Sequence, residues 1–162
     1  MSDGFSRHPS GTSADPVPPL QTAHEPQRSP RRGAILVVED RDDVRQGLSQ
    51  LLELHGYLVA DAPSGENALQ QLEADQGSFA LILLDLMLPG IMSGSELRIH
   101  QLADPVLATI PTIIVTASEL DARERGRLQQ AALLEKPFRF DDLLALVRRY
   151  VLSEGGVFQE SR

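Results

Sequence analysis

The chain has 162 residues, 41% of them hydrophobic, with a formal net charge of −8 and no cysteine. Its length and composition suit a single domain of ordinary size with a buried core. The lack of cysteine excludes disulfides, zinc–cysteine sites and thiol chemistry, and the acidic balance argues against a general nucleic-acid-binding protein, which needs a basic face.

The first segment, residues 1–33, is rich in Pro, Ser, Gly, Thr and Gln and has only scattered apolar side chains. Such a composition cannot bury enough surface to order itself, so we predict a disordered tail, with a tether or partner-binding tail as the alternative. No apolar run suits a signal peptide or a membrane span, which needs roughly 18 apolar residues. The sequence therefore predicts a cytoplasmic protein that does not enter a membrane.

From residue 34 to residue 152, short apolar runs alternate with apolar residues at helical spacing. In chain order we predict a strand at 35–38, a helix at 44–55 ended by Gly56, a strand at 57–60, a helix around 68–72, a strand at 79–84, a helix at 96–102, a strand at 113–115, a helix at 120–130, a strand at 133–134 and a helix at 140–151. Five strand–helix units imply an α/β domain, a doubly wound parallel sheet with helices on both faces. Residues 153–162 are expected to form a short C-terminal tail.

Polar side chains stand where the predicted strands end. Glu39 and Asp40 follow the first strand, and Asp85 follows the third. Thr116 ends the fourth strand, and Lys136, the single lysine of the chain, stands just beyond the fifth. Because the carboxyl ends of parallel strands meet at one edge of a sheet, we expect three carboxylates, a hydroxyl and an ammonium in one crevice.

Each of these residues taken alone has an ordinary structural explanation, since an acid just after a strand commonly caps a helix or lies in a turn. Asp42 and Asp43 are assigned to that role, at the start of the first helix. The coincidence of site-type residues at the ends of four strands favours a functional site for the others.

Clustered carboxylates repel one another, and a divalent cation removes that repulsion. Oxygen ligands with room for water suit Mg²⁺, which also neutralises charge in phosphoryl transfer. An Asp beside such an ion can act as a nucleophile and form an acyl phosphate. The sequence therefore predicts in-line phosphoryl transfer to Asp85, with Lys136 and Thr116 binding phosphoryl oxygens.

Four segments, residues 35–40 (ILVVED), 81–89 (LILLDLMLP), 113–117 (IIVTA) and 136–138 (KPF), closely resemble the receiver domain of response regulators in two-component signalling. Residues 62–69 (APSGENAL) also resemble a segment of that family. The resemblance covers residues 34–152. It implies a flavodoxin-like fold with five parallel strands in the order 2-1-3-4-5.

The resemblance also implies a role for each matching residue. Asp85 corresponds to the phosphorylated aspartate, and Glu39 and Asp40 to the acidic pair that binds Mg²⁺. Met87 corresponds to the position whose backbone carbonyl completes the metal site. The residues that correspond to the phosphate-binding and switch positions are Thr116, Ala117 and Lys136.

Three departures from the family pattern concern the output step. Leu133 stands where the family usually has a switch aromatic, so a rotamer change of that ring cannot operate in its usual form. Gln129-Gln130 replaces the usual Gly-Ala, and the loop after Pro89 looks one residue longer than the common form.

The resulting hypothesis is a phosphoprotein of a phosphorelay that receives its phosphoryl group from a histidine kinase or a histidine phosphotransfer protein. It would be no enzyme beyond its own phosphorylation and dephosphorylation. With no output domain expected in the chain, it would signal through protein–protein contacts of the fourth helix, fifth strand and fifth helix, or as a homodimer. Arg123, Arg125 and Arg127 lie near that surface or form an ordinary solvated helix face. The alternative function is a pseudo-receiver, an interaction module that works without phosphorylation.

Overall fold

The computed structural model describes residues 33–153, so the predicted tails 1–33 and 153–162 lie outside the described residues except at their innermost positions. The elements in chain order are β1 (Ala34–Val38), α1 (Asp42–Leu54), β2 (Val59–Ala62), α2 (Gly65–Ala74), β3 (Phe79–Asp85), α3 (Gly94–Ala103), a 3-10 turn (Leu107–Thr109), β4 (Thr112–Thr116), α4 (Ala122–Leu128), β5 (Ala132–Glu135) and α5 (Phe140–Ser153).

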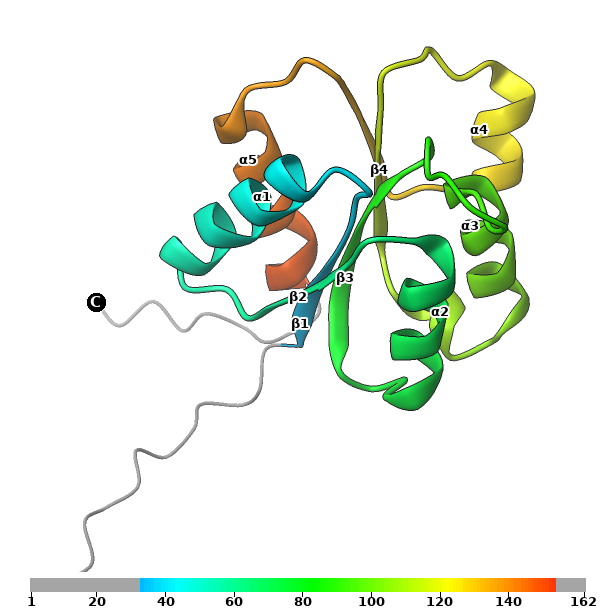
Figure 1. The fold of residues 1–162 in the computed structure, drawn as a ribbon, viewed down its shortest axis with the longest axis horizontal. Helices are drawn as coiled ribbons and strands as arrows, with labels where there is room; N and C mark the ends of the chain where they lie inside the picture. Colours follow the sequence, from blue (N-terminus) through cyan, green and yellow to red (C-terminus); the bar gives the residue numbers. More distant parts are fainter. Residues whose placement is uncertain (1–32, 154–162) are drawn as a thin grey trace, which may run out of the picture.

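The five strands form one parallel sheet in the order β2-β1-β3-β4-β5, which confirms the predicted fold class. Helices α1 and α5 cover one face, and α2, α3 and α4 lie on the other (Figure 1). All of these strands run in the same direction, so their carboxyl ends share one edge of the sheet.

Alternation along the strands explains why both faces are apolar, because successive side chains of a strand point to opposite faces. Ile35 and Val37 of β1 pack with Leu52 of α1 and with α5 on one side. Leu36 and Val38 pack with the α2 and α3 side. A third, smaller apolar cluster lies under α4 and comprises Leu86, Ile114, Leu120 and Leu128, with Leu133 packed against it.

Most of the predicted boundaries differ from the structure by one to three residues, and two of the differences have clear local reasons. The strand expected at 57–60 begins at Val59, because a turn follows the last residue of α1: Gly56 adopts φ +85° and the amide of Tyr57 donates to Leu52 O at 3.2 Å. The helix expected at 120–130 is shorter, because Asp121 caps its start and Gln129 adopts the left-handed φ of 43° at its end.

Candidate functional site

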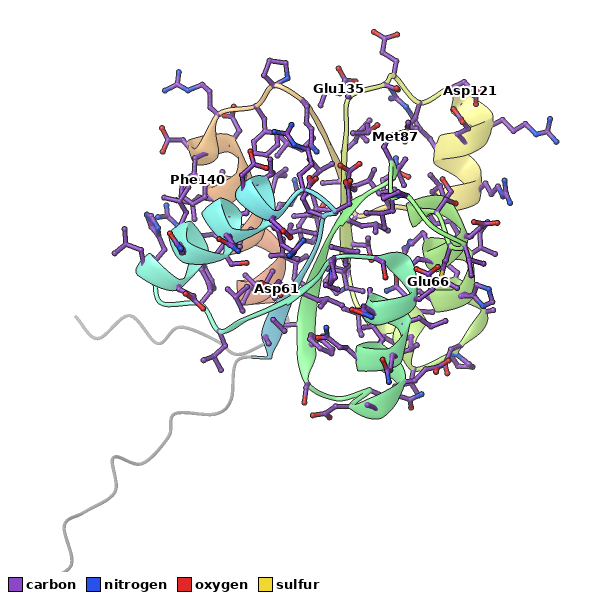
Figure 2. All side chains as sticks on the ribbon, viewed as in Figure 1. Asp61, Glu66, Met87, Asp121, Glu135 and Phe140 are labelled. Carbon is purple, nitrogen blue, oxygen red and sulfur yellow. The ribbon has the colours of Figure 1, made fainter. Side chains whose placement is uncertain are left out.

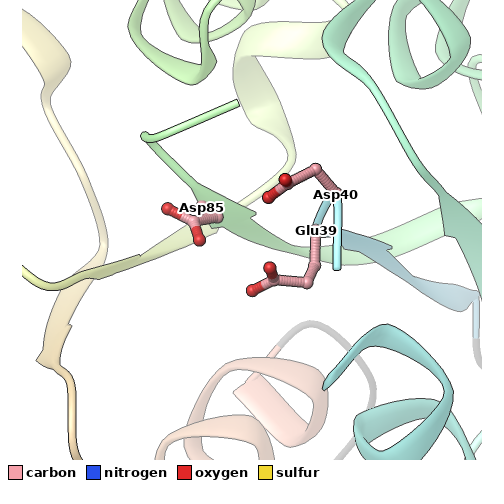
Figure 3. Close-up of side chains that lie close together, drawn as sticks. All are labelled: Glu39, Asp40 and Asp85. Atoms are coloured by element: carbon pink, nitrogen blue, oxygen red, sulfur yellow. The ribbon is translucent and has the colours of Figure 1, made fainter. Parts of the chain in front are cut away.

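Three carboxylates converge at the carboxyl edge of the sheet, as the strand ends predicted. Glu39 and Asp40 follow β1, and Asp85 is the last residue of the neighbouring strand β3. One oxygen from each of the three lies within 4.8 Å of the others (Figure 3). Oxygen ligands at this spacing can hold a hard divalent cation, and the chemistry of the set suits Mg²⁺.

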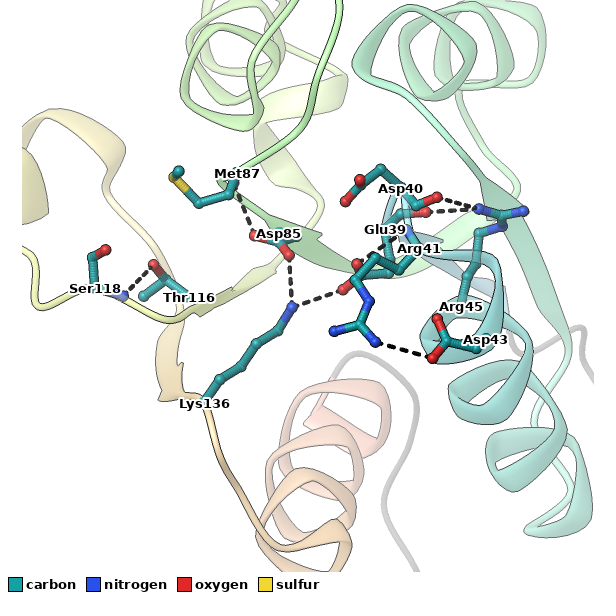
Figure 4. Close-up of polar contacts among 10 residues, drawn as sticks. All are labelled: Glu39, Asp40, Arg41, Asp43, Arg45, Asp85, Met87, Thr116, Ser118 and Lys136. Carbon is teal, nitrogen blue, oxygen red and sulfur yellow. Dashed lines mark hydrogen bonds and ion pairs between the residues drawn. The ribbon is translucent and has the colours of Figure 1, made fainter.

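The ammonium of Lys136 joins two of these carboxylates (Figure 4). Its Nζ donates to Asp85 Oδ2 at 2.6 Å and to Glu39 Oε2 at 2.8 Å. Burial alone would lower the pKa of Lys136, but the hydrogen bonds to Asp85 and Glu39 outweigh it and hold that pKa above its usual value. Lys136 is therefore a fixed positive charge at the centre of the cluster.

Glu39 is the most buried member of the acidic pair, with 3% of its surface exposed. Burial raises the pKa of its carboxyl, and the hydrogen bonds from Lys136 and from the Arg41 amide offset this only in part. The cluster counts three formal negative charges against one ammonium, and a divalent cation would balance the difference.

The second oxygen of Asp85 is held by the loop that follows β3. The amide of Met87 donates to Asp85 Oδ1 at 2.8 Å. Met87 is 67% exposed, and it lies toward the same end of the molecule as Glu135 (Figure 2). The predicted role of the Met87 carbonyl as a metal ligand stays a prediction.

Thr116 reaches the predicted edge but its hydroxyl has a local partner. Its side chain is buried, and Oγ1 accepts a hydrogen bond from the Ser118 amide at 3.1 Å. A backbone hydrogen bond joins Thr116 to the residue that follows β5: the Lys136 amide donates to Thr116 O at 2.8 Å. Ala117 follows Thr116 at the exposed start of the loop to α4, and the predicted binding of phosphate by its backbone amide stays a prediction.

The loop between β3 and α3 is tied to α2 by a carboxylate. Glu66 Oε1 accepts from the amides of Ile91 and Met92 at 2.9 and 3.0 Å, and Gly90 adopts φ +112° beside it. At the far end of the loop, a Cβ on Gly94 would collide with the carbonyl oxygen of Asp85. Glycine is therefore required where α3 passes the end of β3.

The predicted capping role of Asp42 and Asp43 was wrong as to position, because neither residue occupies the N-cap. The residue at the N-cap position is Arg41, which makes no side-chain cap, while both acids lie in the first turn of α1. Asp43 pairs with Arg41 at 3.0 Å, and Asp42 pairs with the guanidinium of Arg45. Arg45 was missed from the sequence, because an arginine on a helix normally lies on the solvated face.

A second buried arginine, Arg98 of α3, holds the end of α4. Its Nε donates to Leu128 O and its Nη2 to Gln129 O, both at 2.8 Å. Its Nη1 donates to the side chains of Gln101 and Thr112 at 2.6 and 3.0 Å. Burial lowers the pKa of Arg98 to about 10, so it remains charged at neutral pH.

Leu133 takes the place expected for an aromatic switch residue and packs beside Leu86, Ile114 and Leu128. Arg123, Arg125 and Arg127 are all exposed on α4, and Arg125 Nε donates to Leu120 O at 2.9 Å. Across residues 33–153, no helix combines the length and apolar character that a bilayer crossing requires.

Residues 35–148 match the family described as the response regulator receiver domain. The chain is 32% identical over 126 residues to the uncharacterized transcriptional regulatory protein YkoG of Bacillus subtilis, covering 76% of this chain and 53% of that protein. It is 36% identical over 117 residues to the transcriptional regulatory protein HprR of Escherichia coli, covering 70% of this chain and 49% of that protein. The chain thus spans about half the length of these curated relatives.

The fold is also similar to those of solved response regulator proteins. Chemotaxis protein CheY4 of Vibrio cholerae matches with a TM-score of 0.66 and 26% identity, over 73% of this chain and 98% of that one. Response regulator TrrA of Thermotoga maritima, in complex with Mg²⁺ and BeF, matches with a TM-score of 0.64 and 28% identity, over 73% of this chain and 98% of that one.

Proposed function

Because the chain belongs to the response regulator receiver domain family, we propose that Asp85 accepts a phosphoryl group from a histidine kinase or a histidine phosphotransfer protein, with Mg²⁺ bound beside it. The observation that carries the proposal is the pairing of Lys136 with Asp85 and Glu39 at 2.6 and 2.8 Å, within a cluster of three carboxylates. An ammonium held at this point can bind a phosphoryl oxygen as soon as one is attached to Asp85.

The mechanism follows from the contacts of Asp85. One carboxylate oxygen forms the new P–O bond while the P–N bond to the donor imidazole breaks, and the imidazole leaves with the electron pair of that bond. Glu39, Asp40 and Asp85 would hold the cation, and Mg²⁺ when bound supplies charge neutralisation for the transferred group. The Met87 amide, already donating to Asp85 Oδ1, keeps the carboxylate oriented.

The chain would then act on its own aspartyl phosphate and on no other substrate, so we propose a signalling domain rather than a general enzyme. We place the exchange in the cytoplasm, where ATP supplies the phosphoryl groups of kinases. The output would be a contact between the surface of α4, β5 and α5 and a protein partner or a second copy of the chain.

A phosphorylation-independent interaction module is the second candidate. Two observations favour it: Leu133 replaces the aromatic residue of the switch, and Arg98 fixes the end of α4 through Leu128 O and Gln129 O. Amide hydrogen exchange across α4, β5 and α5, with and without a phosphodonor, separates the two. A protein that is phosphorylated but shows no change there would signal without the phosphate.

The direct test is intact-protein mass after incubation with acetyl phosphate and Mg²⁺. We expect the addition of one phosphoryl group, lost on addition of a chelator and absent in Asp85→Asn. Folded wild-type protein that gains no mass would refute the proposal, and so would an equal gain in the Asp85→Asn variant.

A further inference from the structure

Arg45 is a buried arginine beneath the turn that carries the acidic pair. It projects from the first turns of α1 and is 9% exposed. Its Nη1 donates to Glu39 O at 2.9 Å and lies 3.4 Å from Asp40 O (Figure 4). Its Nη2 pairs with Asp42 of the same helix, and its Nε lies 3.9 Å from Asp61 Oδ1 at the edge strand β2.

The backbone of the turn between β1 and α1 has few other restraints. The strand ends at Val38 and the helix begins at Asp42, so residues 39–41 lie outside both elements. The Glu39 amide donates to Ala62 O at 3.2 Å. The Arg41 amide donates to the Glu39 side chain, and Arg41 contributes no side-chain cap. The guanidinium of Arg45 is thus what binds the two consecutive carbonyls of the turn.

Those two carbonyls belong to the residues whose carboxylates face Asp85. The orientation of a peptide plane sets the direction in which the adjoining side chains leave the backbone. A rigid guanidinium that holds the carbonyls of Glu39 and Asp40 therefore also fixes where their carboxylates meet. This arrangement corresponds to the outer-shell contacts that orient metal ligands in other proteins.

We propose that Arg45 is a positioning residue for the cation site. It holds the turn of residues 39–41 so that the carboxylates of Glu39 and Asp40 are ready to bind Mg²⁺, and it does not touch the ion. This inference rests on the proposed function, because it assumes that Mg²⁺ occupies the three-carboxylate cluster.

The charge of Arg45 and its positioning contacts should change Mg²⁺ affinity in opposite directions, so a measured affinity distinguishes the two effects. A cation near a metal site repels the incoming ion, so removal of the charge alone would tighten Mg²⁺ binding. Removal of a positioning contact would weaken it, by roughly tenfold or more as for other outer-shell partners. Arg45→Met removes both the charge and the contact, and Arg45→Lys keeps the charge but replaces the rigid planar guanidinium with a shorter, flexible side chain that holds the two carbonyls less firmly.

The experiment measures the Mg²⁺ dissociation constant by isothermal titration calorimetry for the wild-type chain, Arg45→Met and Arg45→Lys. Arg98→Met is the matched control, because it removes a buried arginine far along the chain from the acidic pair. Urea unfolding of each metal-free variant separates stability from affinity. Amide exchange at residues 39–41 without metal reports on the turn itself.

We expect weaker Mg²⁺ binding in both Arg45 variants, faster exchange at 39–41, and wild-type affinity in Arg98→Met. Unchanged or tighter binding in Arg45→Met would overturn the positioning role while leaving the proposed function intact. A comparable loss of affinity in Arg98→Met would also overturn it, since the effect would then follow from general destabilisation. Failure of the wild-type chain to bind Mg²⁺ would refute the metal-dependent function and, with it, this inference. If Arg45→Met does not fold, Arg45→Lys alone decides the question.

Discussion

Replacement of Arg98 by Met should destabilise the domain by removing the donors that satisfy the end of α4. The last carbonyls of a helix have no partner within the helix, and here Leu128 O and Gln129 O both accept from Arg98. Met has a similar length and no donor, so the variant tests the hydrogen bonds rather than the packing.

The expected magnitude follows from the contacts. A buried acceptor left without a donor costs about 1–3 kcal/mol, and Leu128 O would become such an acceptor. Gln129 is exposed, so its carbonyl can accept from water instead and adds less. The side-chain acceptors are less affected, because the Thr112 hydroxyl still donates to Gln101 Oε1 at 3.0 Å. Within residues 33–153 no carboxylate pairs with Arg98, so its removal also relieves the cost of burying a charge. The net loss in the free energy of unfolding should be about 1–3 kcal/mol.

Urea unfolding followed by circular dichroism measures this difference. A domain of this kind has a total stability of about 5–15 kcal/mol, so the variant should remain folded in water. Arg123→Met, on the exposed side of α4, is the control and should stay within about 0.5 kcal/mol of wild type. An Arg98→Met variant as stable as the control would show that the carbonyls at the end of α4 find other donors, and would refute the reasoning.

Three further predictions concern single positions. Gln129 adopts φ 43°, a conformation that costs a residue with a side chain about 1 kcal/mol. Gln129→Gly should therefore raise the free energy of unfolding by up to that amount. A loss of stability in urea unfolding would contradict this. Burial raises the pKa of Glu39 above 4.5, so the native state binds more protons than the unfolded state just above that pH and its stability falls as pH rises through this window. Metal-free Glu39→Gln lacks this component, so it should gain stability relative to wild type as pH rises above the ordinary pKa of a glutamate, and a pH-independent difference would count against the raised pKa. Gly94→Ala places a methyl group against Asp85 O, so it should destabilise the domain and reduce phosphorylation at Asp85 in the mass assay, whereas wild-type behaviour would mean that the loop can shift.

The sequence was sufficient for the fold and for the centre of the site because both depend on local patterns. Apolar runs alternating with helical periods predicted the parallel sheet, and the residues that end the strands predicted the meeting of Glu39, Asp40 and Asp85 with Lys136. This part of the site follows from topology, since parallel strands bring their carboxyl ends together whatever the loops do.

The sequence did not predict the contacts that depend on distant residues. Arg98 and its acceptor Leu128 are 30 positions apart, and nothing in the local pattern around an arginine on a helix indicates burial. The contacts of Arg45 were equally unpredictable, because they depend on how α1 is oriented relative to the carbonyls of Glu39 and Asp40 after β1. The misassigned capping role of Asp42 has the same origin, since its carboxylate pairs with Arg45.

The single lysine of the chain makes the site accessible to chemical labelling. Because Lys136 is the only lysine, an amine-reactive reagent has one side-chain target in the chain besides the terminal amine. That side chain is 26% exposed and its Nζ is shared between Asp85 and Glu39, so it should react slowly when those contacts are made. The labelling rate of one residue, read by peptide mass, would therefore follow occupancy of the site directly, without a fluorophore or an engineered reporter.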